Sequence, residues 1–202
     1  MDLFTDTYRI IESPVEGLFK DRGSKFIAKI HPVENEHDIK EILENLRSEY
    51  YDARHHCYAY ILGPDKSNWR ANDDGEPSGS AGKPIHGQLL SNDLTNILAV
   101  VIRYFGGTKL GIPGLINAYR EAVKDALSQA VILEKTVNET FLLEFDYPVM
   151  DLVMRTIKEK NYTIVATKFE INCQIRFEVR KAEATQALDY FQGIYGVEIV
   201  RE

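Results

Sequence analysis

The sequence has little of what stabilises secreted proteins or anchors a protein in a membrane. Its 202 residues include only two cysteines, Cys57 and Cys173, which lie far apart and lack the spacing of metal ligands. We therefore expect no disulfide framework and a reducing compartment. The longest strongly apolar run, residues 97–102, is too short to span a bilayer, and the acidic residues 1–6 lack the basic region and apolar core of a signal peptide. These absences favour a cytoplasmic protein.

The sequence also lacks an excess of positive charge. It has 24 Lys and Arg residues against 31 Asp and Glu residues, which gives a net charge of −7. A chain of this charge is poorly suited to coating nucleic acid without regard to sequence, although a local basic patch is compatible with it. Hydrophobic residues make up 44% of the sequence, which is enough for ordinary cores in one large domain or two small ones.

The most informative feature that is present is a polar stretch, residues 73–84, with the sequence DDGEPSGSAGKP. It contains three acids, two serines and three glycines but no large apolar side chain. Such a stretch cannot form a core, so it predicts a shaped loop whose backbone and short polar side chains contact something else. A second glycine-rich cluster, residues 103–114 (RYFGGTKLGIPG), follows an apolar segment, and its Ile112-Pro113 pair stiffens the turn expected there.

Hydrophobic periodicity predicts an α+β first domain over residues 1–136. Apolar residues at helical spacing indicate helices over 34–51 and 115–130, with a short helix over 84–90. Strands are expected over the segments 8–12, 25–33, 55–62 and 97–105, with a turn at Gly23 before the second. The last of these is apolar at nearly every position, which is typical of a strand covered on both faces.

Residues 137–202 predict a second, smaller domain. Alternating apolar residues indicate strands over 141–147, 162–170, 172–180 and 197–200, and helical stripes fall at 148–157 and 184–195. The order β-α-β-β-α-β is typical of the ferredoxin-like fold, a scaffold that serves many functions and identifies none by itself.

The polar loop admits several interpretations. Asp73, Asp74 and Glu76 supply oxygen atoms that suit a divalent cation, or they are carboxylates that cap neighbouring amides in a solvated turn. Residues 78–83 suit an anion, because glycines allow successive backbone amides to point into one concavity beside a helix start. They do not match the Walker A pattern, because prolines stand at positions 77 and 84. We predict no cofactor and no metal.

Arg103 interrupts the apolar strand and needs a partner there. A carboxylate from Asp74 or Glu76 would make a structural ion pair that joins the two glycine-rich clusters. Alternatively, Arg103 and Lys109 bind the phosphate or carboxylate of a ligand.

The adjacent histidines His55 and His56 begin a strand, so their side chains point to opposite faces. We expect one to be packed and the other, taken as His56, to face the glycine-rich loops, where a general-base role is conceivable. Ser78 and Ser80 are nucleophiles on chemistry alone, but no histidine and acid partner is evident for either. No catalytic residue is therefore predicted.

Four stretches of the chain resemble the IMPACT/YigZ family in its bacterial, YigZ-type form. They are residues 24–28 (SKFIA), 53–60 (ARHHCYAY), 73–85 (DDGEPSGSAGKPI) and 103–111 (RYFGGTKLG). The resemblance implies a first domain like the second domain of ribosomal protein S5, followed by a ferredoxin-like domain. It also implies a connection with translation, because eukaryotic relatives restrain the kinase of translation initiation factor 2 by competing for its ribosome-associated activator.

The residues and the resemblance together predict a non-enzymatic cytoplasmic binding protein whose partner is RNA, the ribosome or a translation factor. The alternative is an enzyme or small-ligand protein that binds a phosphorylated compound between the loops 73–84 and 103–114. A third interpretation is purely structural, with the polar residues locking the loops to the fold. The side chains expected to contact the ligand or partner are His56, Asp74, Glu76, Ser78, Ser80, Lys83, Arg103 and Lys109.

Overall fold

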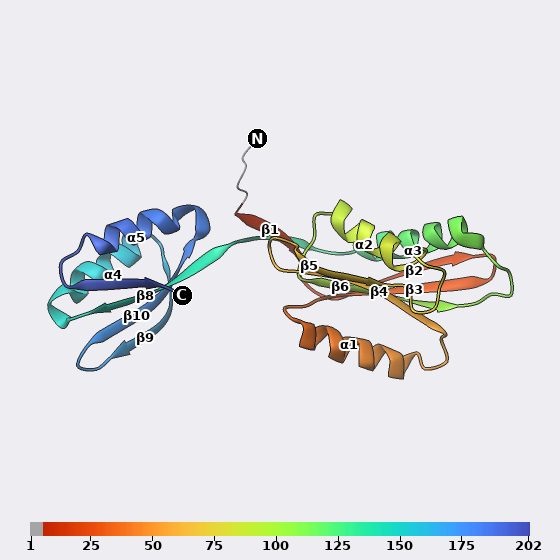
Figure 1. Cartoon of the computed structure of the whole chain (residues 1–202), viewed down its shortest axis with the longest axis horizontal. Helices are drawn as coiled ribbons and strands as arrows, with labels where there is room; N and C mark the ends of the chain where they lie inside the picture. Colours follow the sequence, from red (N-terminus) through yellow and green to blue (C-terminus); the bar gives the residue numbers. More distant parts are fainter. Residues whose placement is uncertain (1–5) are drawn as a thin grey trace. The chain divides into compact units, whose positions relative to one another are not determined.

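The computed structural model describes residues 6–202, which fold as two compact units. The first unit comprises residues 8–135, and the second comprises residues 136–202 together with residues 6 and 7 (Figure 1). The chain is a mixture of helices and strands in both units. No helix in the described part of the chain is long and apolar enough to cross a membrane.

The first unit is built on a five-stranded sheet in which every neighbouring pair is antiparallel, in the order β2-β3-β6-β4-β5. Its strands are β2 (Val15–Asp21), β3 (Ser24–Pro32), β4 (His55–Leu62), β5 (Asn68–Asn72) and β6 (Ile97–Tyr104). Two further strands, β1 (Thr7–Ile11) and β7 (Ile132–Thr136), pair with each other. The central position of β6 places the end of this strand, at Arg103, between β3 and β4.

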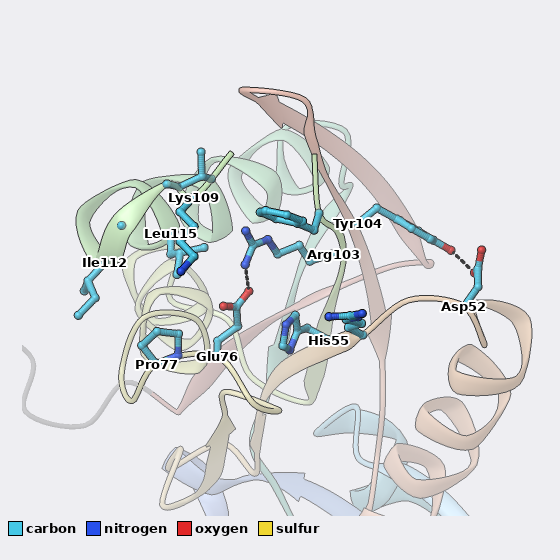
Figure 2. A pocket seen from close by; sticks show the side chains of 13 residues that line it. Asp52, His55, Glu76, Pro77, Arg103, Tyr104, Lys109, Ile112 and Leu115 are labelled. Atoms are coloured by element: carbon cyan, nitrogen blue, oxygen red, sulfur yellow. Dashed lines mark hydrogen bonds and ion pairs between the residues drawn. The ribbon is translucent and has the colours of Figure 1, made fainter. Parts of the chain in front are cut away.

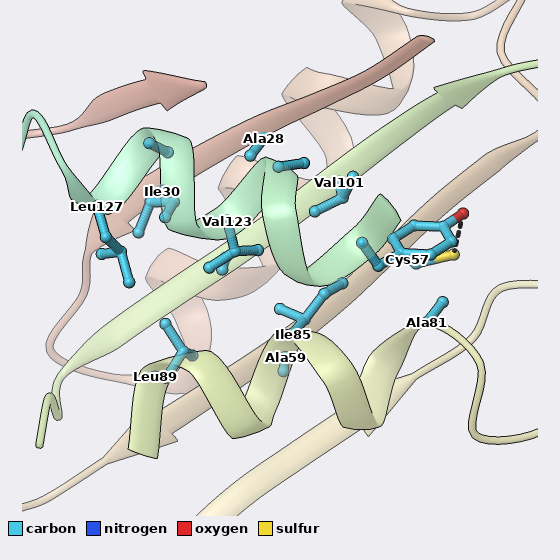
Figure 3. Close-up of a cluster of buried hydrophobic side chains, with 14 of the residues drawn as sticks. Ala28, Ile30, Cys57, Ala59, Ala81, Ile85, Leu89, Val101, Val123 and Leu127 are labelled. Atoms are coloured by element: carbon cyan, nitrogen blue, oxygen red, sulfur yellow. Dashed lines mark hydrogen bonds between the residues drawn. The ribbon is translucent and has the colours of Figure 1, made fainter. Parts of the chain in front are cut away.

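Three helices cover the two faces of this sheet. Helix α1 (Glu36–Glu49) covers one face, while α2 (Gly82–Ser91) and α3 (Gly111–Leu127) cover the other (Figure 1). Alternate side chains of β6 enter two different cores: Val101 packs with α2 and α3, and Val100 packs on the side of α1 (Figure 3). The apolar run in β6 is therefore covered on both faces, as its composition predicts.

The structure has three strands in the first unit that periodicity did not predict, namely β2, β5 and β7. Strand β5 has the sequence NWRAN, in which only Trp69 and Ala71 alternate with polar residues, too short a pattern to predict a strand, and it pairs with the edge of β4. Helix α3 begins at Gly111 rather than at Leu115. Ile112 and Pro113 therefore lie in the first helical turn, where a proline needs no N–H group, and not in the stiffened turn that we expected.

The second unit has the predicted element order. Strand β8 (Asn138–Phe145) leads through a short 3-10 turn into α4 (Met150–Glu159), and the antiparallel strands β9 (Thr163–Phe169) and β10 (Cys173–Arg180) follow. Helix α5 (Ala184–Gln192) comes next, and β11 (Val197–Arg201) completes a four-stranded sheet in the order β11-β8-β10-β9. The inward residues of β8 and β10 pack against both helices around Phe177 and Phe191.

Candidate functional site

The two glycine-rich clusters meet in the first unit and form a pocket of about 890 Å³. Its walls come from the end of β6, the segment between β6 and α3, the first turn of α3, the start of β4 and the loop 73–84 (Figure 2). Figure 2 shows Asp52 and Tyr104 on one side of the pocket and Lys109 and Ile112 on the opposite side. A volume of this size is in the range of small-molecule sites.

A buried ion pair joins the two loops. Arg103 Nη1 donates to Glu76 Oε1 at 2.5 Å, and the side chains of Arg103 and Glu76 are only 8% and 4% exposed. The hydroxyl of Tyr119, on α3, donates to the same carboxylate oxygen at 2.8 Å, and the thiol of Cys57 donates to that hydroxyl at 3.3 Å. The need of Arg103 for a carboxylate partner is thus confirmed, and the partner is Glu76 rather than Asp74.

Asp73 fills the concavity that we considered as an anion site. Its carboxylate accepts hydrogen bonds from the backbone amides of Gly79, Ala81 and Gly82, at 2.8, 3.0 and 2.8 Å. These amides lead into α2, so the carboxylate satisfies donors that a helix start leaves without partners. Burial raises the pKa of Asp73, but the hydrogen bonds from the three amides together lower it by more. The pKa therefore lies below its ordinary value of 3.8. The protein itself therefore occupies this anion site.

The depressed pKa of Asp73 makes the stability of the first unit depend on pH. Because the pKa is lower in the folded state, the contribution of this carboxylate is complete above pH 3.8 and is lost as the pH falls from there through the folded-state value. We expect Asp73→Asn to lower the free energy of unfolding at pH 7 by about 1–2 kcal/mol and to flatten its decline between pH 5 and pH 3.

Urea titrations at several pH values measure this effect through the fluorescence of Trp69, the only tryptophan, which lies on β5 in the first unit. Asp6 and Glu202 also have lowered pKa values, but both belong to the second unit, which has no tryptophan. If the free energy of unfolding falls with pH in the same way for the variant and the unchanged protein, Asp73 is not the source of this pH dependence.

The carboxylate of Asp74 is held by two other groups. One of its oxygens accepts from Arg47 Nη2 at 3.2 Å, and the other accepts from the backbone amide of His56 at 2.7 Å. Its backbone carbonyl accepts from Nδ1 of His55 at 2.8 Å. The three loop acids thus point to separate partners, and among residues 6–202 no group of three or more His, Cys, Asp or Glu side chains is arranged to hold a metal ion.

The structure places some of the predicted site residues in the pocket and others outside it. Glu76, Arg103 and Lys109 line the pocket, whereas His56, Asp74, Ser78, Ser80 and Lys83 do not. His55 takes the position that we expected for His56: the two rings do point to opposite faces, but His56 lies on the side of α1, where burial lowers its pKa. Ser80 is buried, and its hydroxyl donates to the carbonyl of Pro77 at 2.6 Å.

Several pocket residues were not predicted, although a signal for some of them is present in the sequence. Arg54 and His55 lie within the stretch 53–60 that carries the family resemblance. Asp52 carries no such signal, because it is an isolated acid in the connection after α1. It accepts from the hydroxyl of Tyr104 at 2.7 Å, and this hydrogen bond raises the pKa of Tyr104 to about 12.

The pocket combines positive charge with an apolar surface. Three cationic side chains, Arg54, Arg103 and Lys109, line it together with two carboxylates, both of which already accept hydrogen bonds from other side chains. The first turn of α3 also faces it, and this helix start has no side-chain cap. Phe105 is 58% exposed and Ile112 is 51% exposed. This arrangement suits an anion that carries an apolar or aromatic body.

No serine or thiolate nucleophile is available in the pocket among the described residues. The thiol of Cys57 is fully buried, and desolvation raises its pKa far above the ordinary value, so it is not a thiolate at neutral pH. The pocket lining includes no serine and no cysteine. Chemically, the cationic and apolar groups of the lining suit the pocket to binding a ligand.

Comparison with known proteins gives consistent matches. Residues 22–127 match the family model described as the Impact N-terminal domain. The IMPACT family member YvyE of Bacillus subtilis (strain 168) is 32% identical over 160 residues, which are 79% of this chain and 74% of YvyE. The IMPACT family member YigZ of Escherichia coli (strain K12) is 38% identical over 144 residues, which are 70% of this chain and 71% of YigZ. The crystal structure of a hypothetical protein superimposes with a TM-score of 0.72 at 30% identity and covers 98% of both chains.

Proposed function

This chain belongs to the IMPACT family, and from that premise we propose that it is a non-enzymatic cytoplasmic binding protein that acts in translation. The partner that the chemistry of the pocket favours is RNA, bound on the ribosome through the pocket defined by Arg54, Glu76, Arg103, Phe105 and Lys109. The connection with translation comes from the family resemblance. The choice of RNA comes from the anion-binding character of the pocket.

One observation carries the proposal, which is that the pocket pairs cationic side chains with an exposed aromatic ring. Lys109 and Phe105 are both exposed in the segment between β6 and α3, and the buried Arg103 lines the same pocket with its guanidinium against the ring of Phe105. Phosphate contacts from Lys and Arg together with base stacking on an aromatic ring are the usual elements of single-strand recognition. Because the whole chain carries a net charge of −7, we expect binding to be confined to this pocket.

The fold of both units agrees with the two domain classes that the family resemblance implies. The order β11-β8-β10-β9 with two helices on one face supports assigning the second unit to the ferredoxin-like fold. We assign the first unit, with its antiparallel five-stranded sheet, to the class of the second domain of ribosomal protein S5. We place the domain boundary at residues 136 and 137.

The test is co-sedimentation with purified bacterial ribosomes at 50 and 200 mM salt, combined with crosslinking to RNA. We expect the protein to pellet with ribosomes at low salt and the bound fraction to fall at high salt, because phosphate contacts release counterions. Lys109→Glu should reduce the bound fraction several-fold. Lys124→Glu, at the exposed far end of the same helix, is the matched control and should leave it unchanged.

Two results would contradict this proposal. If the protein does not pellet with ribosomes, or if Lys109→Glu pellets as well as Lys124→Glu, the pocket is not the ribosome-binding surface. Pelleting that depends on Lys109 without any crosslink to RNA would identify a translation factor or ribosomal protein as the partner instead of RNA.

A further inference from the structure

We propose that the pocket recognises the terminal phosphate of a nucleotide, a phosphomonoester dianion, and not the phosphodiester backbone of an internal strand. This inference rests on the proposed function in one respect only, because it places the ligand in the same pocket. The shared chemistry of the ligand is a nucleoside with a 5′-phosphomonoester. It can come from a free nucleoside monophosphate or from the 5′-phosphorylated end of an RNA.

The first argument is that Arg103, which lines the pocket, has a donor without a hydrogen-bond partner. Its side chain is 8% exposed, and it makes its hydrogen bond to Glu76 through Nη1. Nε is buried and has no hydrogen-bond partner within the described residues. Glu76 holds the guanidinium at one edge, and the side chain extends towards the part of the pocket where Lys109 and Leu115 lie (Figure 2). A guanidinium fixed in this way is ready to bind a phosphate through its free donors.

The second argument is the start of α3. This helix of 17 residues begins at Gly111, and its Ncap residue Leu110 provides no side-chain hydrogen bond to the first amides. Gly111 and Ile112 line the same pocket as Arg103. The corresponding amides at the start of α2 are satisfied by Asp73, so the two helix starts differ: one holds a carboxylate of the protein, and the other faces the pocket. An oxyanion is the group that such a helix start favours.

The third argument is the distribution of the cationic side chains. An internal strand is bound by a track of cations that follows many phosphates, and each phosphodiester carries a single charge. Here the cations Arg54, Arg103 and Lys109 gather in one pocket on an acidic protein. A terminal phosphomonoester carries a charge of about −1.5 to −2 at neutral pH and offers three oxygens to one site. With the carboxylates of Asp52 and Glu76 in the same lining, the three cations leave one net positive charge in a single pocket, which matches one strand end better than a track along the middle of a strand.

The fourth argument concerns the rest of the ligand. The ring of Phe105 is 58% exposed and lies over the guanidinium of Arg103, with 5.7 Å between the guanidinium carbon and the ring centroid. An exposed ring beside the phosphate site is a surface on which a base can stack. On the opposite side of the pocket from Lys109, the carboxylate of Asp52 accepts one hydrogen bond from Tyr104. Its remaining acceptor capacity suits the hydroxyl groups of a ribose.

The experiment measures binding to the isolated full-length protein, without ribosomes, by calorimetry and by ³¹P NMR. The probes are AMP, GMP, CMP and UMP, with adenosine, inorganic phosphate and the 5′-methyl phosphodiester of AMP as comparisons. A 5′-phosphorylated RNA decamer and the same decamer with a 5′-hydroxyl distinguish a strand end from a free nucleotide. Phenyl phosphate tests whether any aromatic phosphate, such as a phosphotyrosine, is sufficient.

We expect the monophosphates or the 5′-phosphorylated RNA to bind at least about tenfold more tightly than the phosphodiester, the 5′-hydroxyl RNA and phenyl phosphate. Lys109→Ala and Phe105→Ala should each weaken binding about tenfold or more, and Phe105→Tyr should retain it. Lys124→Ala is the matched control for the lost charge. Tighter binding of the RNA than of every monophosphate assigns the ligand to a strand end, and equal binding assigns it to the free nucleotide.

Three results would overturn the proposal. They are the absence of binding of every phosphomonoester at millimolar concentration, binding of both RNA decamers with the same affinity whether the 5′ end is phosphorylated or not, and equal binding of phenyl phosphate and the nucleotides. Each of these results can be told apart from a failure of the proposed function, because the two tests can fail separately. A protein that does not pellet with ribosomes can still bind a nucleotide, and one that pellets can fail to distinguish a phosphorylated end.

Discussion

Replacing Glu76 by alanine should lower the free energy of unfolding of the first unit by about 3–5 kcal/mol, because it leaves a buried charge without its partner. The side chains of Arg103 and Glu76 are 8% and 4% exposed, so water solvates the unpaired guanidinium poorly compared with the lost carboxylate. The hydroxyl of Tyr119, on a fully buried side chain, loses its acceptor in the same step. Urea unfolding followed by the fluorescence of Trp69 measures the change in the unit that contains both residues.

A matched control and a second variant separate burial from charge. Glu44→Ala breaks the ion pair with Lys40, in which both side chains are more than two thirds exposed, and it should leave the unfolding curve almost unchanged. The double change Glu76→Ala with Arg103→Met should recover much of the lost stability, because it removes the unpaired charge and keeps an apolar side chain. If Glu76→Ala is no more destabilising than Glu44→Ala, the ion pair does not hold the two loops together.

Gly106→Ala should destabilise the first unit by roughly 2–4 kcal/mol, because a methyl group at this position has no space. A Cβ built on Gly106 would lie 1.9 Å from the carbonyl carbon of Gly23 and 2.1 Å from the backbone nitrogen of Ser24. Both neighbours are backbone atoms in the turn between β2 and β3, so a side-chain rotation cannot relieve the contact. The hydrogen bond from the amide of Gly106 to Ser24 Oγ, at 3.1 Å, should break as the segment moves away.

Gly87→Ala is the matched control for this substitution. Gly87 lies inside α2 and is exposed, and a Cβ there would meet no atom within 4 Å. Alanine should therefore stabilise the helix by about 0.5–1 kcal/mol through the lower flexibility of the unfolded chain. Urea unfolding of both variants, again followed at Trp69, should show shifts of opposite sign. A Gly106→Ala protein as stable as Gly87→Ala would show that the close approach of the two turns is not required.

The Gly106 variant also connects the fold to the pocket. Phe105 and Lys109, which we propose stack on the base and bind the phosphate, stand on either side of Gly106 in the segment between β6 and α3. The close packing of Gly106 on the turn at Gly23 fixes where this segment leaves the sheet. A protein that tolerates Gly106→Ala at low temperature should therefore bind nucleotides more weakly while keeping every residue that contacts them.

Much of the fold could be predicted because the sequence encodes it locally. The apolar run of β6 predicted a strand buried on both faces, and the stripe at Ile39 and Leu46 predicted α1. The second unit followed from alternation in β10 and from two helical stripes. Strand β5 could not be found in this way, because only two apolar residues, Trp69 and Ala71, alternate in its five positions and its hydrogen bonds come from β4.

The site could be predicted only in part. Arg103 was identified because a charge within an apolar run requires a partner, and the four sequence stretches were sufficient to recognise the family. Which carboxylate pairs with Arg103, and which histidine faces the pocket, depended on distances of a few ångströms between segments far apart in the chain. Sequence patterns carry side-chain periodicity but not such distances, so Asp52 and Phe105 were not expected in the pocket.

By itself, the sequence determined the family of this protein, most of its helices and strands, and the presence of a polar loop too rich in glycine and acids to form a core. Only the tertiary structure decided what that loop does. The backbone amides of the loop donate to the carboxylate of Asp73, which therefore occupies the anion site of the loop. Glu76 pairs with Arg103. We therefore propose that a ligand binds at the uncapped start of α3 beside Arg103 and Lys109, where the two glycine-rich clusters meet.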